Sequence, residues 1–309
     1  MNVAVFMGGS SEERAISLKS GSAVVEALKV TYQEVAPFDV EWIGSRTLFD
    51  AVDECLARRI DVVFNTLHGG LGENGGVQAV LEAAGLLYTG SGILASGLAM
   101  DKNLSKTLFR HHGIPTADWL CGKSGELTPE RIEREIGFPC VVKPVDQGSS
   151  VGVVVVKTPP ELPGALKDVI SFGPRVMVER FIPGRELSVP VLVDTSLPVI
   201  EIRPKHGIYD FECKYTTGMS EYEIPAPIPS ALAEKLSEYA LGVFRVLGLR
   251  DIARIDFRLD DQGSPVCFEA NTLPGMTATS LVPKSAAHAG IDFPGLVRRI
   301  VEAAMSRKG

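Results

Sequence analysis

A predicted hairpin over residues 254–271 gathers side chains that are suited to metal chemistry. Charged and apolar residues alternate along its first strand, an Asp-rich turn that ends in Gly follows, and a second strand returns. Because alternate residues of a strand point to one face, Asp256 can lie beside Glu269 and Asn271. Two carboxylates and an amide oxygen suit Mg²⁺, which completes its shell with water and substrate phosphates. A surface hairpin with solvated charges is the alternative interpretation.

Glycine-rich loops provide further places for a ligand. Loops 8–11 and 68–75 each follow an apolar run that predicts a strand of a sheet buried on both faces, and ligands bind at the carboxyl ends of such strands. The first loop matches neither the Walker A pattern nor Gly-x-Gly-x-x-Gly. The pair Glu12 and Glu13 follows it and would repel phosphate, which favours an amine-bearing ligand over a helix-capping role. Farther along, Gly275 lets backbone N–H groups approach a ligand closely.

Lysines mark a candidate phosphate site. Lys143 lies in an apolar run that predicts a strand over 139–144, and a lysine buried in a strand points to a phosphate contact. The loop over 145–152 is rich in small residues, and its backbone N–H groups could cradle phosphate as a nest does. Lys102 and Lys106 lie four residues apart on one face of a predicted helix, for which a solvated basic stripe is the alternative interpretation.

Periodicity predicts the elements that must position these residues. Helices are expected over 14–29, 77–84, 90–112, 130–136, 230–247 and 292–306. Strands are expected over 3–7, 61–66, 139–144, 153–156 and 198–203, with a pair of strands and their turn over 176–189. The segment 204–229 is long and rich in polar and turn-forming residues, which is typical of a lid or binding loop.

Composition narrows the classes of partner. The chain has 309 residues, enough for two or three domains, and a net charge of −7 without a Lys/Arg-rich block. Small substrates are therefore expected, and neither nucleic acid nor a membrane surface. The five cysteines form no Cys-x-x-Cys pair, and the sequence has neither a signal-peptide pattern nor an apolar run of about 18 residues. These features predict a cytoplasmic protein with reduced cysteines.

The motifs together resemble those of the D-alanine–D-alanine ligases, a family of the ATP-grasp superfamily. The resemblance covers essentially the whole chain, and it rests on the order and spacing of the motifs more than on any one of them. The matching motifs are GGSSEER at 8–14, HGGLGENG at 68–75, YTGS at 88–91, MDK at 100–102, VKP at 142–144, GSSVG at 148–152, YDFECKY at 209–215 and EANTLPGMT at 269–277.

The resemblance implies an α/β fold that is α+β in its ATP-grasp part. An N-terminal doubly wound parallel-sheet domain would cover 1–98, a central ATP-grasp domain 99–182, and a C-terminal ATP-grasp and metal-binding domain 183–309. ATP would lie between antiparallel sheets of the last two domains. The resemblance also implies a homodimer.

Matched position by position, the resemblance implies which residues bind the nucleotide and the metal. Glu179 and Ile182 would contact the adenine, and Glu186 the ribose. Three lysines would contact the phosphates: Lys102, Lys143 and Lys214. Two Mg²⁺ or Mn²⁺ ions would be held by the residues that the hairpin brings together, namely Asp256, Glu269 and Asn271.

The resemblance implies substrate contacts in the same way. Glu13 would hold the ammonium group of the first D-alanine, linked by hydrogen bonds to Ser149 and Tyr215. Arg254 and the Gly275 N–H would stabilise the oxyanion of the tetrahedral intermediate. The remaining substrate-binding residues would be His68 and, at the carboxylate of the second D-alanine, Ser280 and Leu281.

The implied reaction is the ATP-dependent joining of two D-alanine molecules through an acyl phosphate, with release of ADP and phosphate, for peptidoglycan precursor synthesis. Tyr215 is neutral at pH 7, which favours D-alanine over the anion D-lactate as second substrate. Ligases that use D-lactate or D-serine are the nearest alternatives. A non-catalytic nucleotide-binding module is a more distant one, because all three metal-ligand positions are present. A dehydrogenase is also a distant alternative, because its only support is a single Gly-rich turn, which is weak evidence.

Overall fold

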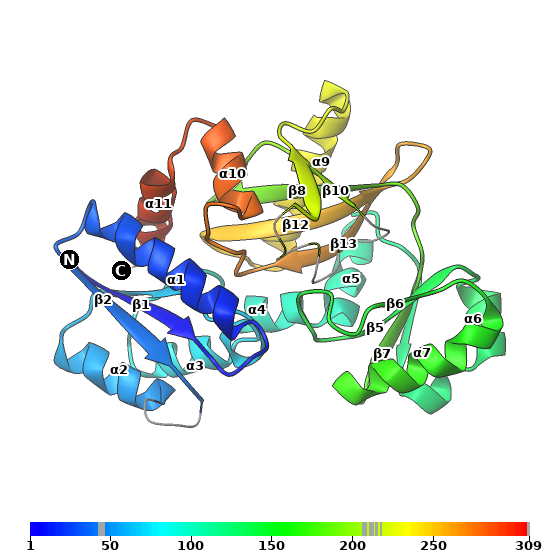
Figure 1. The fold of residues 1–309 in the computed structure, drawn as a ribbon, viewed down its shortest axis with the longest axis horizontal. Coiled ribbons are helices and arrows are strands. Elements are labelled where there is room, and N and C mark those ends of the chain that lie inside the picture. The colour runs from blue at the N-terminus through cyan, green and yellow to red at the C-terminus, as the bar shows by residue number, and fades with distance from the viewer. Residues whose placement is uncertain (43–46, 206–208, 210–212, 214–215, 217, 308–309) are drawn as a thin grey trace.

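The computed structural model describes residues 1–42, 47–205, 209, 213, 216 and 218–307 (Figure 1). Within these ranges the strands form one parallel sheet and two antiparallel sheets. The parallel sheet has the order β2-β1-β3 and consists of β1 (Asn2–Gly8), β2 (Glu34–Val40) and β3 (Val62–Asn65). The predicted α/β class, with antiparallel sheets after a parallel one, is confirmed.

Helices cover both faces of the parallel sheet. They are α1 (Arg14–Lys29) on one face and α2 (Leu48–Ala57) with α3 (Gly76–Ala83) on the other (Figure 1). Alternation along β1 explains the arrangement, because Val3 and Val5 pack with α1 while Ala4 and Phe6 pack with α2 and α3. The carboxyl ends of β1 and β3 and the start of α1 are joined by Ser17, which accepts a hydrogen bond from Gly8 N at 2.9 Å and donates one to Thr66 O at 2.6 Å.

The two antiparallel sheets make up the rest of the molecule and face each other there (Figure 1). One has the order β4-β7-β5-β6 and consists of β4 (Trp119–Gly122), β5 (Cys140–Pro144), β6 (Val154–Val156) and β7 (Val176–Arg180). The other has the order β11-β10-β8-β12-β13, with β9 paired to β8. Its strands are β8 (Arg185–Leu192), β9 (Thr195–Ser196), β10 (Ile200–Pro204), β11 (Ser220–Glu223), β12 (Ile252–Leu259) and β13 (Pro265–Asn271).

Helices pack against the outer faces of these sheets. The four-stranded sheet shares its core with α6 (Pro129–Glu135) and α7 (Leu162–Val169), and the larger sheet shares its core with α9 (Ser230–Val246). Further helices are α10 (Leu281–His288), α11 (Phe293–Met305) and the short 3₁₀ turns Gly70–Gly72, Ser124–Glu126, Pro159–Glu161 and Ile170–Phe172. Within the described ranges, every helix is too short or too polar to span a lipid bilayer.

The predicted helix over 90–112 is two helices, α4 (Ile93–Met100) and α5 (Lys102–His111). Asp101 separates them because its backbone is extended and its carboxylate accepts a hydrogen bond from Leu104 N at 2.9 Å. This contact is an N-cap, which satisfies a backbone donor at the start of α5. The prediction of one continuous helix was therefore wrong at its centre, where Asp101 ends α4 and caps the start of α5.

The predicted lid over 204–229 is only partly described. Its residues 220–223 form β11, which pairs with β10, so this part is a strand and not a loop. Lys214 and Tyr215 lie outside the described residues.

The last helix returns to the first sheet. Residues of α11 such as Val297 and Ile300 share a hydrophobic core with Val3 and Val5 of β1, and α11 lies beside α1. The domain limits expected after residues 98 and 182 stay a prediction, since this core joins both ends of the chain.

Candidate active site

A cavity lies between the two antiparallel sheets, and it is lined by residues of three strands that were predicted from the sequence. Glu179 comes from β7, Lys143 from β5, and Asp256 from β12. The cavity is also lined by Lys102, Ile182, Glu186 and Glu269. These residues are the ones predicted at the nucleotide and the metal, apart from Asn271 and the undescribed Lys214.

Two further hollows continue from this cavity toward the first sheet. The nearer one shares Lys102 and Glu269 with the cavity and is also lined by Glu13, His68, Ser149 and Asn271. The farther one shares Arg254 and Gly275 with the nearer and is lined by Ser280 and Leu281. Every predicted site residue within the described ranges thus lines one of three adjoining hollows.

The hairpin of β12 and β13 carries the candidate metal face. Asp256 pairs with Glu269 across the two strands, and the register shifts at the next position, where Phe257 pairs with Cys267. Phe268 is therefore the extra residue of a β-bulge. The bulge lets Cys267 remain in the core while Phe268 and Glu269 both line the cavity.

Two of the candidate metal ligands, Asp256 and Glu269, are paired with cations of the chain itself. Arg254 contacts both oxygens of Asp256 at 2.8–3.2 Å, and Ser188 Oγ donates to the same carboxylate at 2.6 Å. Lys102 Nζ lies 3.2 Å from Glu269 Oε1. Burial alone would lower the pKa of Arg254, but the Asp256 carboxylate raises it above its usual value.

The donor set fits a hard cation that also binds phosphate. Asp256, Glu269 and Asn271 offer carboxylate and amide oxygens, and their neighbouring cations could move to a phosphate. No group of three His, Cys, Asp or Glu side chains suited to a metal occurs among the described residues. A magnesium ion here would therefore need the Asn271 amide and substrate phosphates to complete its shell.

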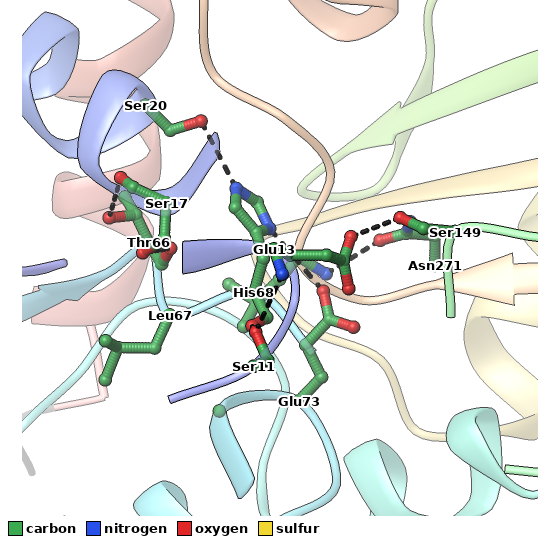
Figure 2. A network of polar contacts seen from close by, with 12 residues as sticks. Ser11, Glu13, Ser17, Ser20, Thr66, Leu67, His68, Glu73, Ser149 and Asn271 are labelled. Carbon is green, nitrogen blue, oxygen red and sulfur yellow. Dashed lines mark hydrogen bonds and ion pairs between the residues drawn. The ribbon is translucent and has the colours of Figure 1, made fainter. Parts of the chain in front are cut away.

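Glu13 lies where the first sheet meets the loop after β5 (Figure 2). Ser149 Oγ donates a hydrogen bond to Glu13, and Figure 2 shows the two side chains pointing toward each other with Asn271 beside them. The backbone φ of Ser149 is +52°, a left-handed conformation that turns the loop toward Glu13. Gly148 also lies close to Glu13, since a Cβ at this position would be 3.4 Å from Glu13 Oε2, an ordinary van der Waals distance.

His68 is connected to a carboxylate that sequence reasoning left without a role. His68 Nδ1 lies 3.6 Å from Glu73 Oε1, and His68 Nε2 lies 3.2 Å from Ser20 Oγ (Figure 2). Burial raises the pKa of Glu73, and Glu13 adds to this by repulsion, whereas the hydrogen bond from His68 opposes it. Glu73 belongs to the glycine-rich motif at 68–75, which was its only signal in the sequence.

Lys106 is the second functional candidate that sequence reasoning missed. The interpretation of Lys102 and Lys106 as a solvated stripe is wrong, because both are buried and Lys106 is 0% exposed. Lys106 Nζ lies 2.7 Å from Glu179 Oε2, and Lys143 Nζ lies 2.5 Å from Glu179 Oε1. Burial alone would raise the pKa of Glu179, but the two lysines lower it to about 2. The carboxylate is therefore ionised at neutral pH.

The third hollow ends at the start of α10. Ser280 precedes this helix and accepts a hydrogen bond from Thr277 N at 3.1 Å. A Cβ on Gly275 would lie 2.9 Å from Ser280 Oγ, so the glycine lets the two segments approach closely. Free N–H groups at a helix start favour an anion such as a carboxylate.

Comparison with known proteins gives a consistent answer. Residues 44–91 match the model of the D-ala D-ala ligase N-terminus, and residues 108–302 match that of the D-ala D-ala ligase C-terminus. The chain is 42% identical to the D-alanine–D-alanine ligase of Pelotomaculum thermopropionicum, over 100% of this chain and 98% of the relative. It is 46% identical to that of Paramagnetospirillum magneticum, over 98% of each.

Solved structures agree. The D-alanine–D-alanine ligase of Bacillus anthracis complexed with ATP matches with a TM-score of 0.86 at 34% identity, over 100% of both chains. The VanG D-Ala:D-Ser ligase of Enterococcus faecalis matches with a TM-score of 0.83 at 27% identity, over 98% of this chain and 100% of that one.

Proposed function

The chain belongs to the D-alanine–D-alanine ligase family, and from this premise we propose that it joins two D-alanine molecules to D-alanyl-D-alanine with hydrolysis of ATP to ADP and phosphate. The observation that supports the proposal most is the series of three adjoining hollows. Lys102 and Glu269 line both the first and the second, and Arg254 and Gly275 line both the second and the third. This order suits a nucleotide, a first amino acid and a second amino acid in one line.

The first step would activate a carboxylate, which is otherwise a poor acyl donor. ATP would lie in the cavity between the antiparallel sheets, with its phosphates toward Lys102 and Lys143. Asp256, Glu269 and Asn271 would hold magnesium, which when bound offsets the charge on the transferred phosphoryl group. The product of this step would be an acyl phosphate of the first D-alanine.

The second step would be attack by the amine of the second D-alanine. Glu13, aligned by Ser149, would bind the ammonium group of the first D-alanine and fix its position. Arg254 and the Gly275 N–H would stabilise the negative charge on the carbonyl oxygen, and such donors contribute roughly 3–4 kcal/mol each in other enzymes. The start of α10, with Ser280 and Leu281, would receive the second carboxylate.

Substrate positioning in the second hollow would involve His68 and Glu73. Glu73 Oε1 lies 3.6 Å from His68 Nδ1, and burial raises the pKa of Glu73, so the two side chains form one buried contact in this hollow. We place this pair beside the first D-alanine, because Glu13 and Glu73 both lie within 4 Å of the Cβ position of Gly148.

The dipeptide would serve peptidoglycan precursor synthesis in the cytoplasm, and we propose a homodimer, both on the basis of the family. Lys214 and Tyr215 are proposed at the phosphates and beside Ser149, and both lie outside the described residues.

The test is phosphate release from ATP and Mg²⁺ with D-alanine, L-alanine or no amino acid, with products resolved by mass spectrometry. We expect release and dipeptide with D-alanine alone, because D-alanine is the substrate that the family implies. Equal D-alanine and D-lactate at pH 7 should yield mainly the dipeptide. Predominant ester would contradict the choice of second substrate, and release that is independent of the amino acid would contradict the ligase proposal.

A further inference from the structure

The Glu179 carboxylate is bound by two lysines from different elements. Lys106 Nζ of α5 contacts Oε2 at 2.7 Å, and Lys143 Nζ of β5 contacts Oε1 at 2.5 Å. Each oxygen thus has its own cation. The exposed fractions of the two lysines are 0% and 5%, and that of Glu179 is 6%, so the cluster is shielded from water.

The two lysines differ in what they can reach. Lys143 lines the cavity between the antiparallel sheets, together with Lys102 and the candidate metal ligands. Lys106 does not line that cavity, and its Nζ lies 5.2 Å from the centre of the Trp119 ring. Trp119 is itself fixed, because its indole N–H donates to Asn103 Oδ1 at 2.8 Å. Lys143 can therefore exchange Glu179 for a ligand, whereas Lys106 is fixed behind the carboxylate.

The end of the cavity at Glu179 suits a flat ring with a hydrogen-bond donor. Ala117, Val155, Phe181 and Ile182 line it there as apolar walls. An ionised carboxylate can only accept hydrogen bonds, so it favours a ring edge that carries an amino group over one that carries a carbonyl. Burial alone would raise the pKa of Glu179, and the lysines lower it to about 2, which keeps it an acceptor throughout the physiological range.

We propose that Lys106 is a positioning residue that sets the base specificity of the nucleotide site by holding Glu179 ionised and oriented, while Lys143 leaves Glu179 for the phosphates when the nucleotide binds. This inference rests on the proposed binding of ATP in this cavity. Without Lys106, the departure of Lys143 would leave a buried carboxylate with neither of its two cations. Burial of an uncompensated charge is strongly unfavourable, so the exchange itself would be opposed.

The test uses full-length protein with Mg²⁺ and compares ADP with inosine diphosphate, whose ring carries a carbonyl in place of the adenine amino group. Lys106→Met keeps an unbranched side chain of nearly the same length and removes its charge. We expect ADP binding measured by calorimetry to weaken roughly tenfold or more, which corresponds to one charge-assisted hydrogen bond. The ratio of the two dissociation constants should fall toward one. Lys167→Met, at an exposed position of α7, should change neither value.

A purely structural role for Lys106 predicts a different result. It would lower the melting temperature of Lys106→Met without changing the preference between the two nucleotides, and this outcome overturns the proposal. A positioning role also predicts that the loss in ADP affinity relative to wild type grows as pH falls from 8 to 5.5, because Glu179 without Lys106 becomes easier to protonate. In turnover, KM for ATP should rise more than kcat falls.

A wild-type measurement remains informative if Lys106→Met does not fold. In protein with ¹⁵N-labelled lysine, ADP should shift the Nζ resonance of Lys143 and leave that of Lys106 in place. Equal shifts of both resonances contradict the exchange. Failure of wild type to bind ADP at all would instead refute the proposed function, so the two failures are distinct.

Discussion

At the scale of single residues, Glu269 provides the most direct test of the metal proposal. Glu269→Gln keeps the shape of the side chain but removes the charge opposite Asp256, so turnover should fall roughly a hundredfold or more while the fold persists. Steady-state rates across a Mg²⁺ titration measure the effect, and circular dichroism checks the fold. Glu234→Gln, at an exposed position of α9, is the matched control and should behave as wild type. A near-normal rate in Glu269→Gln would refute the assignment.

Glu179 predicts how stability depends on pH. Its folded pKa of about 2 lies below the ordinary value of 4.5, so its contribution to the free energy of unfolding is present above pH 4.5 and is lost as pH falls toward 2. The difference of about 2.5 units corresponds to a contribution on the order of 3 kcal/mol. Burial lowers the pKa of Lys106, although the Glu179 carboxylate opposes this. The pKa of Glu179 is thus governed by its two lysine partners, whereas the pKa of Lys106 is governed by its burial.

The measurement is urea unfolding of wild type and Glu179→Gln between pH 6 and 2.5. The variant leaves two buried lysines without an anion and should be less stable at pH 6, and the gap should narrow steadily below pH 4.5. A gap that stays constant over this range would show that Glu179 is not ionised in the folded protein.

The roles of residues within the motifs could be predicted from the sequence, but those of two buried neighbours, Lys106 and Glu73, could not. The acidic and amide positions of the hairpin could be inferred because strand alternation alone brings them together. Lys106 and Glu73 could not be interpreted, since each depends on its burial beside a residue of another segment. Glu179 is 73 positions from Lys106, and no local pattern joins them.

At the scale of elements, α5 carries both Lys102 and Lys106 and begins at the Asp101 cap. Asp101→Ala should lower the free energy of unfolding by about 1 kcal/mol and raise KM for ATP, because fraying displaces the two lysines. Thr128→Ala removes the N-cap of α6, which carries no proposed site residue. It should cost similar stability and leave KM unchanged, as measured by denaturation and ATP titration. An equal rise of KM in both variants would contradict this account.

Helices and strands were predicted correctly where the hydrophobic periodicity was strong, and they were missed where a single residue interrupted that periodicity. The helix predicted over 14–29 is confirmed as α1. The strand β2 was missed because Pro37 interrupts it, and proline is tolerated there since β2 is an edge strand of its sheet. The bulge at Phe268 was also missed, because it depends on pairing with β12 and not on local pattern.

At the scale of the whole molecule, Arg307 joins the first sheet to the last one. Its guanidinium pairs with the buried Asp251 and donates to Tyr88 O at 2.7 Å, while Asp251 also accepts a hydrogen bond from Gly90 N at 2.8 Å. Arg307→Ala should reduce the free energy of unfolding by about 2 kcal/mol, because it leaves the buried Asp251 carboxylate without its cation. The loss is smaller than for a fully buried pair because Arg307 is itself partly exposed.

The control for this prediction is Arg298→Ala, which removes a surface pair with Glu302 at 3.4 Å on α11. It should cost less than about 1 kcal/mol in the same urea titration. Adding Asp251→Asn to Arg307→Ala should recover part of the loss, because it removes the unpaired buried charge. Similar costs for Arg298→Ala and Arg307→Ala would refute the link between the sheets.

The return of α11 to the first sheet has a consequence for synthesis of the chain on the ribosome. The face of β1 that bears Val3 and Val5 emerges well before α11, which completes its core. At about 5–20 residues per second, the interval between the two elements is roughly 15–60 s. During that time the part of this face that α1 leaves for α11 stays exposed, so a nascent chain that stalls before residue 293 would present an apolar surface to chaperones and to aggregation.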